Sequence, residues 1–177
     1  TMALSGIVTI SCISFGIVPA LLIGIGAGVL VGVINGIVIG KFKANPIIWT
    51  LAMNFVVSGI IRWVYSNKQI YPDVESGGSI AGEMFTNISR TYLWGIPISV
   101  FIMIGLLLIG QFVLSKTRYG KQLKIIGSNI DTAKLTGINV SRNILIAYII
   151  ASFAAALAGI FVTSFGKVGA YYNGEGY

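Results

Sequence analysis

Four long apolar windows constrain the fold of this chain more than any other feature of its sequence. They cover residues 16–40, 46–66, 94–114 and 144–166. Each holds about the 20 apolar residues that a helix needs to cross a bilayer core of roughly 30 Å. Residues 1–14 are apolar but too short to cross alone, so we expect the tail of an earlier helix or a re-entrant piece packed beside the next span. The windows predict an all-α integral membrane protein, built as a multi-pass bundle of transmembrane helices.

The composition excludes the soluble classes of protein. Of the 177 residues, 55% are hydrophobic and 10% are charged, and the mean hydropathy is +0.89. Soluble domains carry about 25% charged residues. A net charge of +7 would suggest nucleic acid in a soluble protein, but here the basic residues gather at the ends of the apolar windows. We therefore expect membrane lipid, and no nucleic acid, around this chain.

The residues that support catalysis or metal binding are scarce. The chain has no histidine, and its single cysteine, Cys12, excludes an internal disulfide. All five acidic residues lie outside the apolar windows, so no paired carboxylates or Ser/His/Asp set is expected in a cavity. The GxxxxGK[ST] phosphate-binding motif is also missing from the sequence. We expect no enzyme, metal site or cofactor, and if the chain takes part in an ATP-driven process, another subunit must hydrolyse the ATP.

The charged residues divide the loops into two groups. Segment 115–142 together with Lys41 and Lys43 carries eight basic residues and one acid. The opposite side, residues 67–93 and 167–177, carries three basic residues and four acids. Cytoplasmic loops of membrane proteins carry an excess of Lys and Arg. This bias predicts that 115–142 is a cytoplasmic segment and 67–93 an extracellular loop.

Glycines recur every four residues along the first window, and they predict close helix packing. The ridge consists of Gly24, Gly28, Gly32, Gly36 and Gly40. Residues four apart lie on nearly the same helix face, and small residues at this spacing let membrane helices approach closely. Asn35 lies beside this ridge, and an unpaired amide in a low-dielectric setting costs a few kcal/mol. We expect Asn35 to form a hydrogen bond to another helix.

The second window contains a polar stripe with two possible roles. Thr50, Asn54 and Ser58 are spaced four residues apart and so share a helix face. They can line a path for a hydroxyl-rich solute, or they can join two helices by hydrogen bonds. The sequence leaves both interpretations open.

The basic segment contains a short helix with recognisable ends. Ser128 is predicted to cap a helix over 129–136, Asp131 suits the positive end of its dipole, and Gly137 ends it. Gly120 and Gly127 are expected to permit sharp bends before it. Because a helix of about two turns is unstable alone in water, we expect it to dock against a partner.

Seven short stretches of the sequence form a recognisable set. They are Gly32–Gly36 (GVING), Asn45–Leu51 (NPIIWTL), Thr117–Lys121 (TRYGK), Ile126–Asn129 (IGSN), Ala133–Ile138 (AKLTGI), Ala155–Ile160 (AALAGI) and Gly174–Tyr177 (GEGY). Together they resemble the permease subunit of bacterial ABC importers of the ribose and other monosaccharide type. The similarity runs through most of the chain and is most specific between Thr117 and Ile138.

The resemblance implies a specific assembly in the bacterial plasma membrane. Its parts are a homodimer of two permease copies, a cytoplasmic ABC ATPase and an extracellular solute-binding protein. The 129–137 helix corresponds to the element that couples the permease to the ATPase, with Ala133 small enough for close contact. The coupling residues expected from this similarity are Gly120, Gly127, Ser128, Asn129, Asp131, Ala133, Lys134 and Gly137.

The resemblance implies import of a monosaccharide, with ribose first, by a protein of which this chain is about half. Related permeases carry nucleosides, autoinducer sugars or branched-chain amino acids. A passive channel or facilitator that uses the same polar stripe, and a purely structural membrane subunit, are the alternatives from other classes.

Overall fold

The protein consists almost entirely of helices. The computed structural model describes residues 1–177 except 67, 73–79, 90, 94 and 170–177. In chain order the elements are α1 (Met2–Ser11), η1 (Ile13–Phe15), α2 (Ile17–Phe42), α3 (Pro46–Tyr65), α5 (Ile80–Ile88), β1 (Tyr92–Leu93), β2 (Ile96–Pro97), α6 (Ile98–Lys116), α7 (Arg118–Ser128), α8 (Ile130–Leu135) and α9 (Val140–Gly166). The two strands form a minimal antiparallel hairpin. The predicted all-α class of membrane protein is confirmed.

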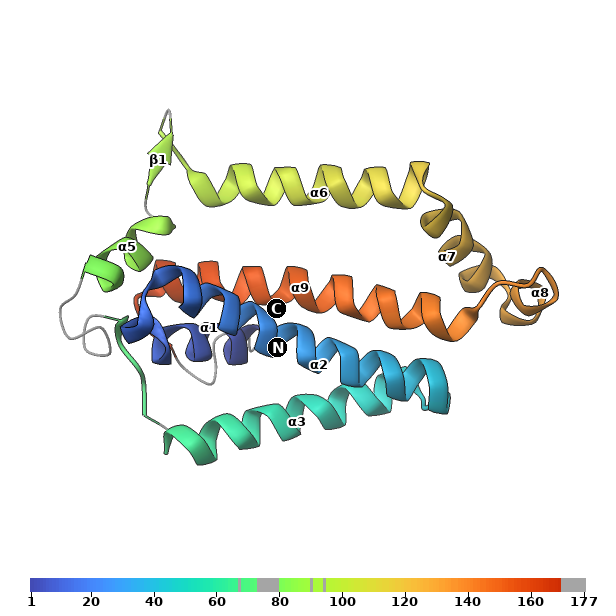
Figure 1. Ribbon diagram of the computed structural model, residues 1–177, viewed down its shortest axis with the longest axis horizontal. Coiled ribbons are helices and arrows are strands. Elements are labelled where there is room, and N and C mark those ends of the chain that lie inside the picture. The colour runs from blue at the N-terminus through green and yellow to red at the C-terminus, as the bar shows by residue number, and fades with distance from the viewer. Residues whose placement is uncertain (67, 73–79, 90, 94, 170–177) are drawn as a thin grey trace.

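Four helices are long and apolar enough to cross a bilayer, namely α2, α3, α6 and α9. They lie roughly parallel in Figure 1, with α5 and the hairpin at one end and α7 and α8 at the other. The predicted windows agree with these helices except where local capping intervenes. The third helix begins at Ile98 rather than 94 because the hairpin ends at Pro97, and the fourth begins at Val140 rather than 144 because Asn139 caps it.

The helices α2 and α9 form the central pair, and the glycine ridge of α2 faces α9. A Cβ atom added to Gly28 would lie 2.6 Å from the Cβ of Ala156, and one added to Gly36 would lie 2.9 Å from the Cα of Leu145. The Ser141 hydroxyl of α9 also donates to the carbonyl of Gly40 at 2.6 Å. These contacts bring the two backbones close together.

The first helix, α1, packs beside both members of this pair. Its Ser5 hydroxyl donates to the carbonyl of Ala156 at 3.1 Å, and Gly24 of α2 lies against Thr9. The chain then reverses at Gly16, whose φ of 106° is a backbone conformation that residues with a side chain rarely adopt. Gly24 is thus the member of the ridge that faces α1 rather than α9.

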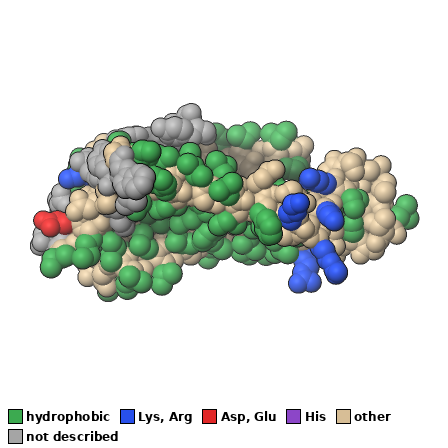
Figure 2. Space-filling view, turned by 90° about the horizontal axis from the view of Figure 1, so that it is seen from above, with side chains coloured by type: hydrophobic (Ala, Val, Ile, Leu, Met, Phe, Trp, Pro, Cys, Tyr) green, Lys and Arg blue, Asp and Glu red, His purple; other side chains and the backbone are tan. Residues whose placement is uncertain are grey.

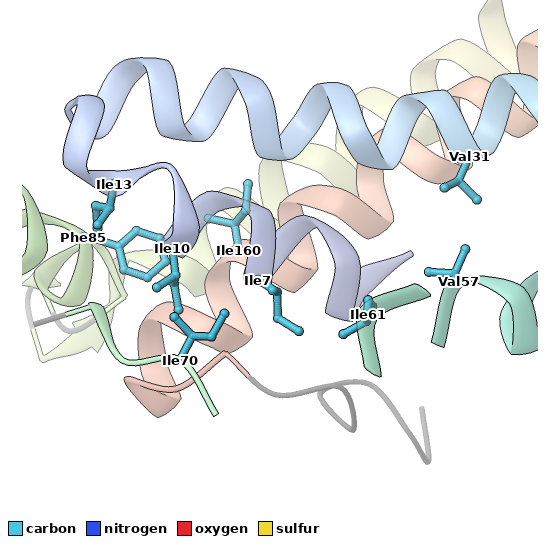
Figure 3. Close-up of a cluster of buried hydrophobic side chains, with 9 residues drawn as sticks. All are labelled: Ile7, Ile10, Ile13, Val31, Val57, Ile61, Ile70, Phe85 and Ile160. Carbon is cyan, nitrogen blue, oxygen red and sulfur yellow. The ribbon is translucent and has the colours of Figure 1, made fainter. Parts of the chain in front are cut away.

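A cluster of buried hydrophobic side chains lies around α1. Figure 3 shows its side chains, which come from α1, η1, α2, α3, α5 and α9 and from the segment after α3. Most of them gather around α1, and Val31 and Val57 lie farther along the bundle. The members are Ile7, Ile10, Ile13, Val31, Val57, Ile61, Ile70, Phe85 and Ile160. Backbone hydrogen bonds between Ile70 and Gly169 join the segment after α3 to the end of α9. The part of 67–93 that the structure describes therefore packs against the bundle.

Hydrophobic and charged side chains occupy different parts of the bundle surface, as expected for a membrane protein. Figure 2 shows hydrophobic side chains along the molecule and a cluster of Lys and Arg near one end. Helix α6 has no buried residue in the described structure and stands apart from α2 and α3 in Figure 1. Apolar side chains that would be unfavourable in water are compatible with a hydrocarbon surrounding.

Candidate functional site

A cavity of about 320 Å³ lies between α2, α3 and α9. Polar groups from all three helices meet there among apolar ones, and none of the described side chains that line it is charged. The lining residues are Thr1, Val31, Asn35, Thr50, Met53, Asn54, Val57, Tyr148, Ala151, Ser152 and Ala155. Such a cavity suits a neutral solute that forms hydrogen bonds.

The polar stripe of α3 contributes two of its three predicted residues to this cavity. Thr50 and Asn54 line it, whereas the half-buried Ser58 is not among the lining residues. The Thr50 hydroxyl donates to the carbonyl of Pro46 at 2.8 Å, within its own helix. It therefore does not join α3 to another helix.

Asn35 forms the predicted hydrogen bond between helices and also lines the cavity. Its side-chain oxygen accepts from the indole N–H of Trp49 on α3 at 2.9 Å. Our sequence reasoning missed Tyr148 and Ser152, which supply the polar groups of α9. Their spacing of four residues inside an otherwise apolar window is the signal that could have found them.

The predicted short helix of the basic segment is present as α8, but its cap is not the predicted residue. The side chain of Asn129 accepts from the backbone N–H of Asp131 at 2.8 Å and of Thr132 at 3.1 Å. Ser128 instead ends α7, and its hydroxyl donates back to the carbonyl of Ile125. The capping prediction for Ser128 is therefore wrong, because an earlier helix continues through that residue.

The roles that we expected for two glycines are also wrong, because both residues belong to α7. Gly120 and Gly127 lie within α7, and the chain instead bends at Thr117 and Asn129, which have extended backbone conformations. Gly120 is buried because α7 begins against the end of α6, where an added Cβ would clash with the carbonyl of Leu114. Gly127 has open space around it among the described residues.

The end of α8 follows a well-defined stop motif. The N–H of Gly137 donates to the carbonyl of Lys134, and the N–H of Ile138 donates to that of Ala133. This pair of bonds is the Schellman motif, which requires a left-handed residue, and Gly137 has φ +75°. The position of α8 after α7 is thus set by a cap at each end.

The exposed face of α8 differs from the expected one. Ala133 is 0% exposed and packs inside the chain, so it is not available for contact with a partner. Leu135 is 89% exposed and Ile130 is also exposed. Large apolar side chains that remain open at the basic end of the bundle are candidates for an interface.

Charge at this end is arranged around Asp131. The Lys134 ammonium lies 2.7 Å from its carboxylate, and both groups are exposed. The hydrogen bond from Lys134, its positive charge and that of Lys43 hold the pKa of Asp131 below its ordinary value.

The hydroxyl of Tyr119 joins α7 to α9. It donates to the carbonyl of Asn143 at 3.1 Å, and burial raises the pKa of this phenol.

The corrected cap yields a direct prediction. Replacing Asn129 with alanine removes the acceptor for two amides and should destabilise α8 by about 1 kcal/mol, since N-caps contribute that much. Hydrogen exchange at the amides of Asp131 and Thr132 in the intact permease should then be about fivefold faster. The exchange is carried out on the folded protein and read by mass spectrometry on the proteolytic fragments that cover α8. The matched variant Ser128→Ala should leave both amides unchanged, and the reverse pattern would contradict the structure.

These features define the class of protein. Four membrane-crossing helices, a polar cavity between three of them with no charged side chain in its described lining, and a structured basic segment at one end describe a multi-pass membrane permease. Residues 1–174 match the family described as branched-chain amino acid transport system / permease component. The chain belongs to this family, and the resemblance identified from its sequence is confirmed.

Curated relatives of the chain include permease proteins that are named for sugars. It is 30% identical over 168 residues to the ribose import permease protein RbsC of Haemophilus influenzae, covering 92% of this chain and 50% of that protein. It is 34% identical to RbsC of Bacillus subtilis, covering 92% and 49%. It is 33% identical to the D-allose transport system permease protein AlsC of Escherichia coli, covering 92% and 48%.

The chain thus spans about half the length of these relatives. No solved structure matches the chain significantly. The family and the four apolar helices make it a multi-pass protein of the inner membrane.

Proposed function

We propose that this chain is part of the membrane-spanning subunit of an ATP-binding cassette importer for a monosaccharide, with ribose as the first candidate. The relatives named for ribose and D-allose support this class of solute. The translocation path is proposed to include the cavity that Thr50 and Asn54 line.

The absence of charged side chains among the described residues that line this cavity is the observation that carries the proposal. A monosaccharide is neutral and carries several hydroxyl groups, which need donors and acceptors such as amides and hydroxyls. A branched-chain amino acid carries an ammonium and a carboxylate, which are costly to desolvate without charged partners. The described lining offers uncharged hydrogen-bonding groups, so it favours the sugar.

We place the ATPase at the basic end of the bundle and the solute-binding protein at the opposite end. The excess of Lys and Arg supports a cytoplasmic location for α7 and α8. The exposed Leu135 and Ile130 give α8 an apolar surface for the ATPase. A second permease copy completes the proposed assembly, by similarity to the family.

The connections of α8 suggest how force is transmitted. It is joined to α6 through α7 and leads directly into α9, which lines the cavity. Closure of the ATPase on its nucleotide would push on α8 and shift α6 and α9 relative to α2 and α3. Such a movement between two packed arrangements would alternate the access to the cavity.

A variant pair on α3 tests the proposed path. Asn54→Leu should lower ATP-driven D-ribose uptake about tenfold, because a solute hydroxyl facing leucine lacks a partner. Ser58→Ala, one turn away and outside the cavity lining, should transport at the wild-type rate. The measurement is the initial rate in proteoliposomes that contain the intact permease, its ATPase and its binding protein.

The opposite outcomes identify the alternatives. Impaired uptake in Ser58→Ala with normal uptake in Asn54→Leu would show that the solute does not pass through this cavity. Uptake that continues at the same rate without ATP or the ATPase would favour a passive facilitator.

A further inference from the structure

The amide of Asn35 has a fixed orientation. Its Oδ1 lies 2.9 Å from Nε1 of Trp49, and Asn35 is 8% exposed. An indole nitrogen can only donate a hydrogen bond, so the atom that faces it must be the amide oxygen. This chemistry removes the usual ambiguity between the two ends of an amide. The NH₂ group of Asn35 therefore points away from Trp49.

The NH₂ group of Asn35 is not used inside the described structure. Its Nδ2 has no hydrogen-bond partner among the described residues. Every side-chain nitrogen or oxygen that is fully buried in the described structure does have a partner, so Nδ2 is not fully buried. Nδ2 must therefore be accessible, and the cavity is the space that Asn35 lines. The NH₂ group can therefore donate to an incoming group.

The neighbouring polar groups complement these donors. The hydroxyl proton of Thr50 is used by the carbonyl of Pro46, so towards the cavity Thr50 offers lone pairs that accept. Ser152 also lines the cavity, and a serine hydroxyl can donate or accept. A sugar hydroxyl both donates and accepts, and the cavity supplies each kind of partner.

We propose that the side-chain nitrogen of Asn35 binds a hydroxyl oxygen of the solute, and that Trp49 is the positioning residue that aims it. The inference rests on the proposed function and adds a donor site that the helix-packing role of Asn35 does not require. Without Trp49 the amide can rotate and present its oxygen instead, so the cavity loses a fixed donor. The effect is on selectivity for a hydroxyl as well as on rate.

Two variants of the intact permease separate this role from a structural one. Asn35→Asp keeps an oxygen to accept from Trp49 but replaces the NH₂ by a second oxygen. Trp49→Phe keeps an aromatic ring but removes the donor that orients the amide. Trp63→Phe is the matched control, because Trp63 lies on the same helix and is 83% exposed.

The assay compares D-ribose with its 2-deoxy, 3-deoxy and 5-deoxy analogues in the reconstituted importer. Because the same saturating binding protein is used throughout, its own selectivity cancels between permease variants. Asn35→Asp should slow ribose uptake about tenfold, and both variants should lower the preference for ribose over one deoxy analogue about fivefold. Trp63→Phe should match the wild type in rate and preference.

The outcomes distinguish this inference from the proposed function. Failure of the wild type to import any sugar would overturn the proposed function, and the inference with it. A wild type that imports ribose, alongside both variants with unchanged preference among the analogues, would overturn the inference alone. Samples are compared per amount of monodisperse protein, so a loss of folding does not imitate a loss of selectivity.

Discussion

Replacing Gly32 with leucine is expected to prevent the intact protein from folding. An added Cβ would lie 2.5 Å from the Cβ and Oγ of Ser152 and 2.8 Å from the backbone carbonyl of Tyr148. The backbone of α9 cannot move away without breaking the neighbouring contacts of the glycine ridge. Overpacking of this kind costs about 3 kcal/mol or more, and leucine adds three carbons beyond Cβ. Monodisperse protein recovered after detergent extraction should fall to background.

Gly26 provides the matched control on the same helix. It is exposed, and an added Cβ would meet nothing within 4 Å in the described structure. Gly26→Leu should therefore be recovered in wild-type amounts, with a thermal midpoint equal to or slightly above wild type because leucine favours helix more than glycine does. Equal losses for both variants would show that α2 does not pack on α9 through this ridge.

Replacing Leu135 with arginine is expected to abolish ATP-driven uptake while the permease remains folded. The side chain is 89% exposed, so the substitution disturbs no packing within the chain. If α8 docks on the ATPase as proposed, a charge placed in that apolar contact should reduce association at least tenfold. The measurements are the amount of ATPase that co-purifies with the permease and the initial rate of ribose uptake.

Ala133→Arg tests the same helix from its buried side. Ala133 is 0% exposed, so arginine would force both bulk and charge into the contact of α8 with the chain. This variant should be lost as misfolded protein, whereas Leu135→Arg should be recovered in full. Normal recovery of Ala133→Arg, or normal ATPase association of Leu135→Arg, would contradict the orientation of α8.

The membrane-crossing helices could be predicted because the requirement they meet is local. A run of apolar residues long enough to cross a bilayer is visible in the sequence whatever it packs against. The ends of the runs were less accurate, since hydropathy does not report the hairpin before Ile98 or the Asn139 cap before Val140. Helix α7 was missed for a related reason. Its apolar and basic residues are interspersed along a short helix, so the sequence has no continuous apolar window there.

The candidate site could be predicted in part. Thr50 and Asn54 lie in the cavity, but the same spacing also selected Ser58, which does not line it. Periodicity identifies the residues that share a helix face, whereas the neighbouring helices determine how far along that face a cavity extends. The hydrogen bond of Asn35 was expected, but its partner Trp49 could not be named, because the pairing depends on the relative rotation of α2 and α3.

The sequence alone determined that the chain is a helical membrane protein, that its basic segment lies at one end, and that glycines form a ridge for close packing. Each follows from hydropathy, charge or spacing along the chain. The tertiary structure decided that the ridge faces α9, that Ala133 is buried and Leu135 exposed, and that Asn35 accepts a hydrogen bond from Trp49. These depend on how the helices rotate and cross, which is set by side chains far apart in the sequence fitting together in space.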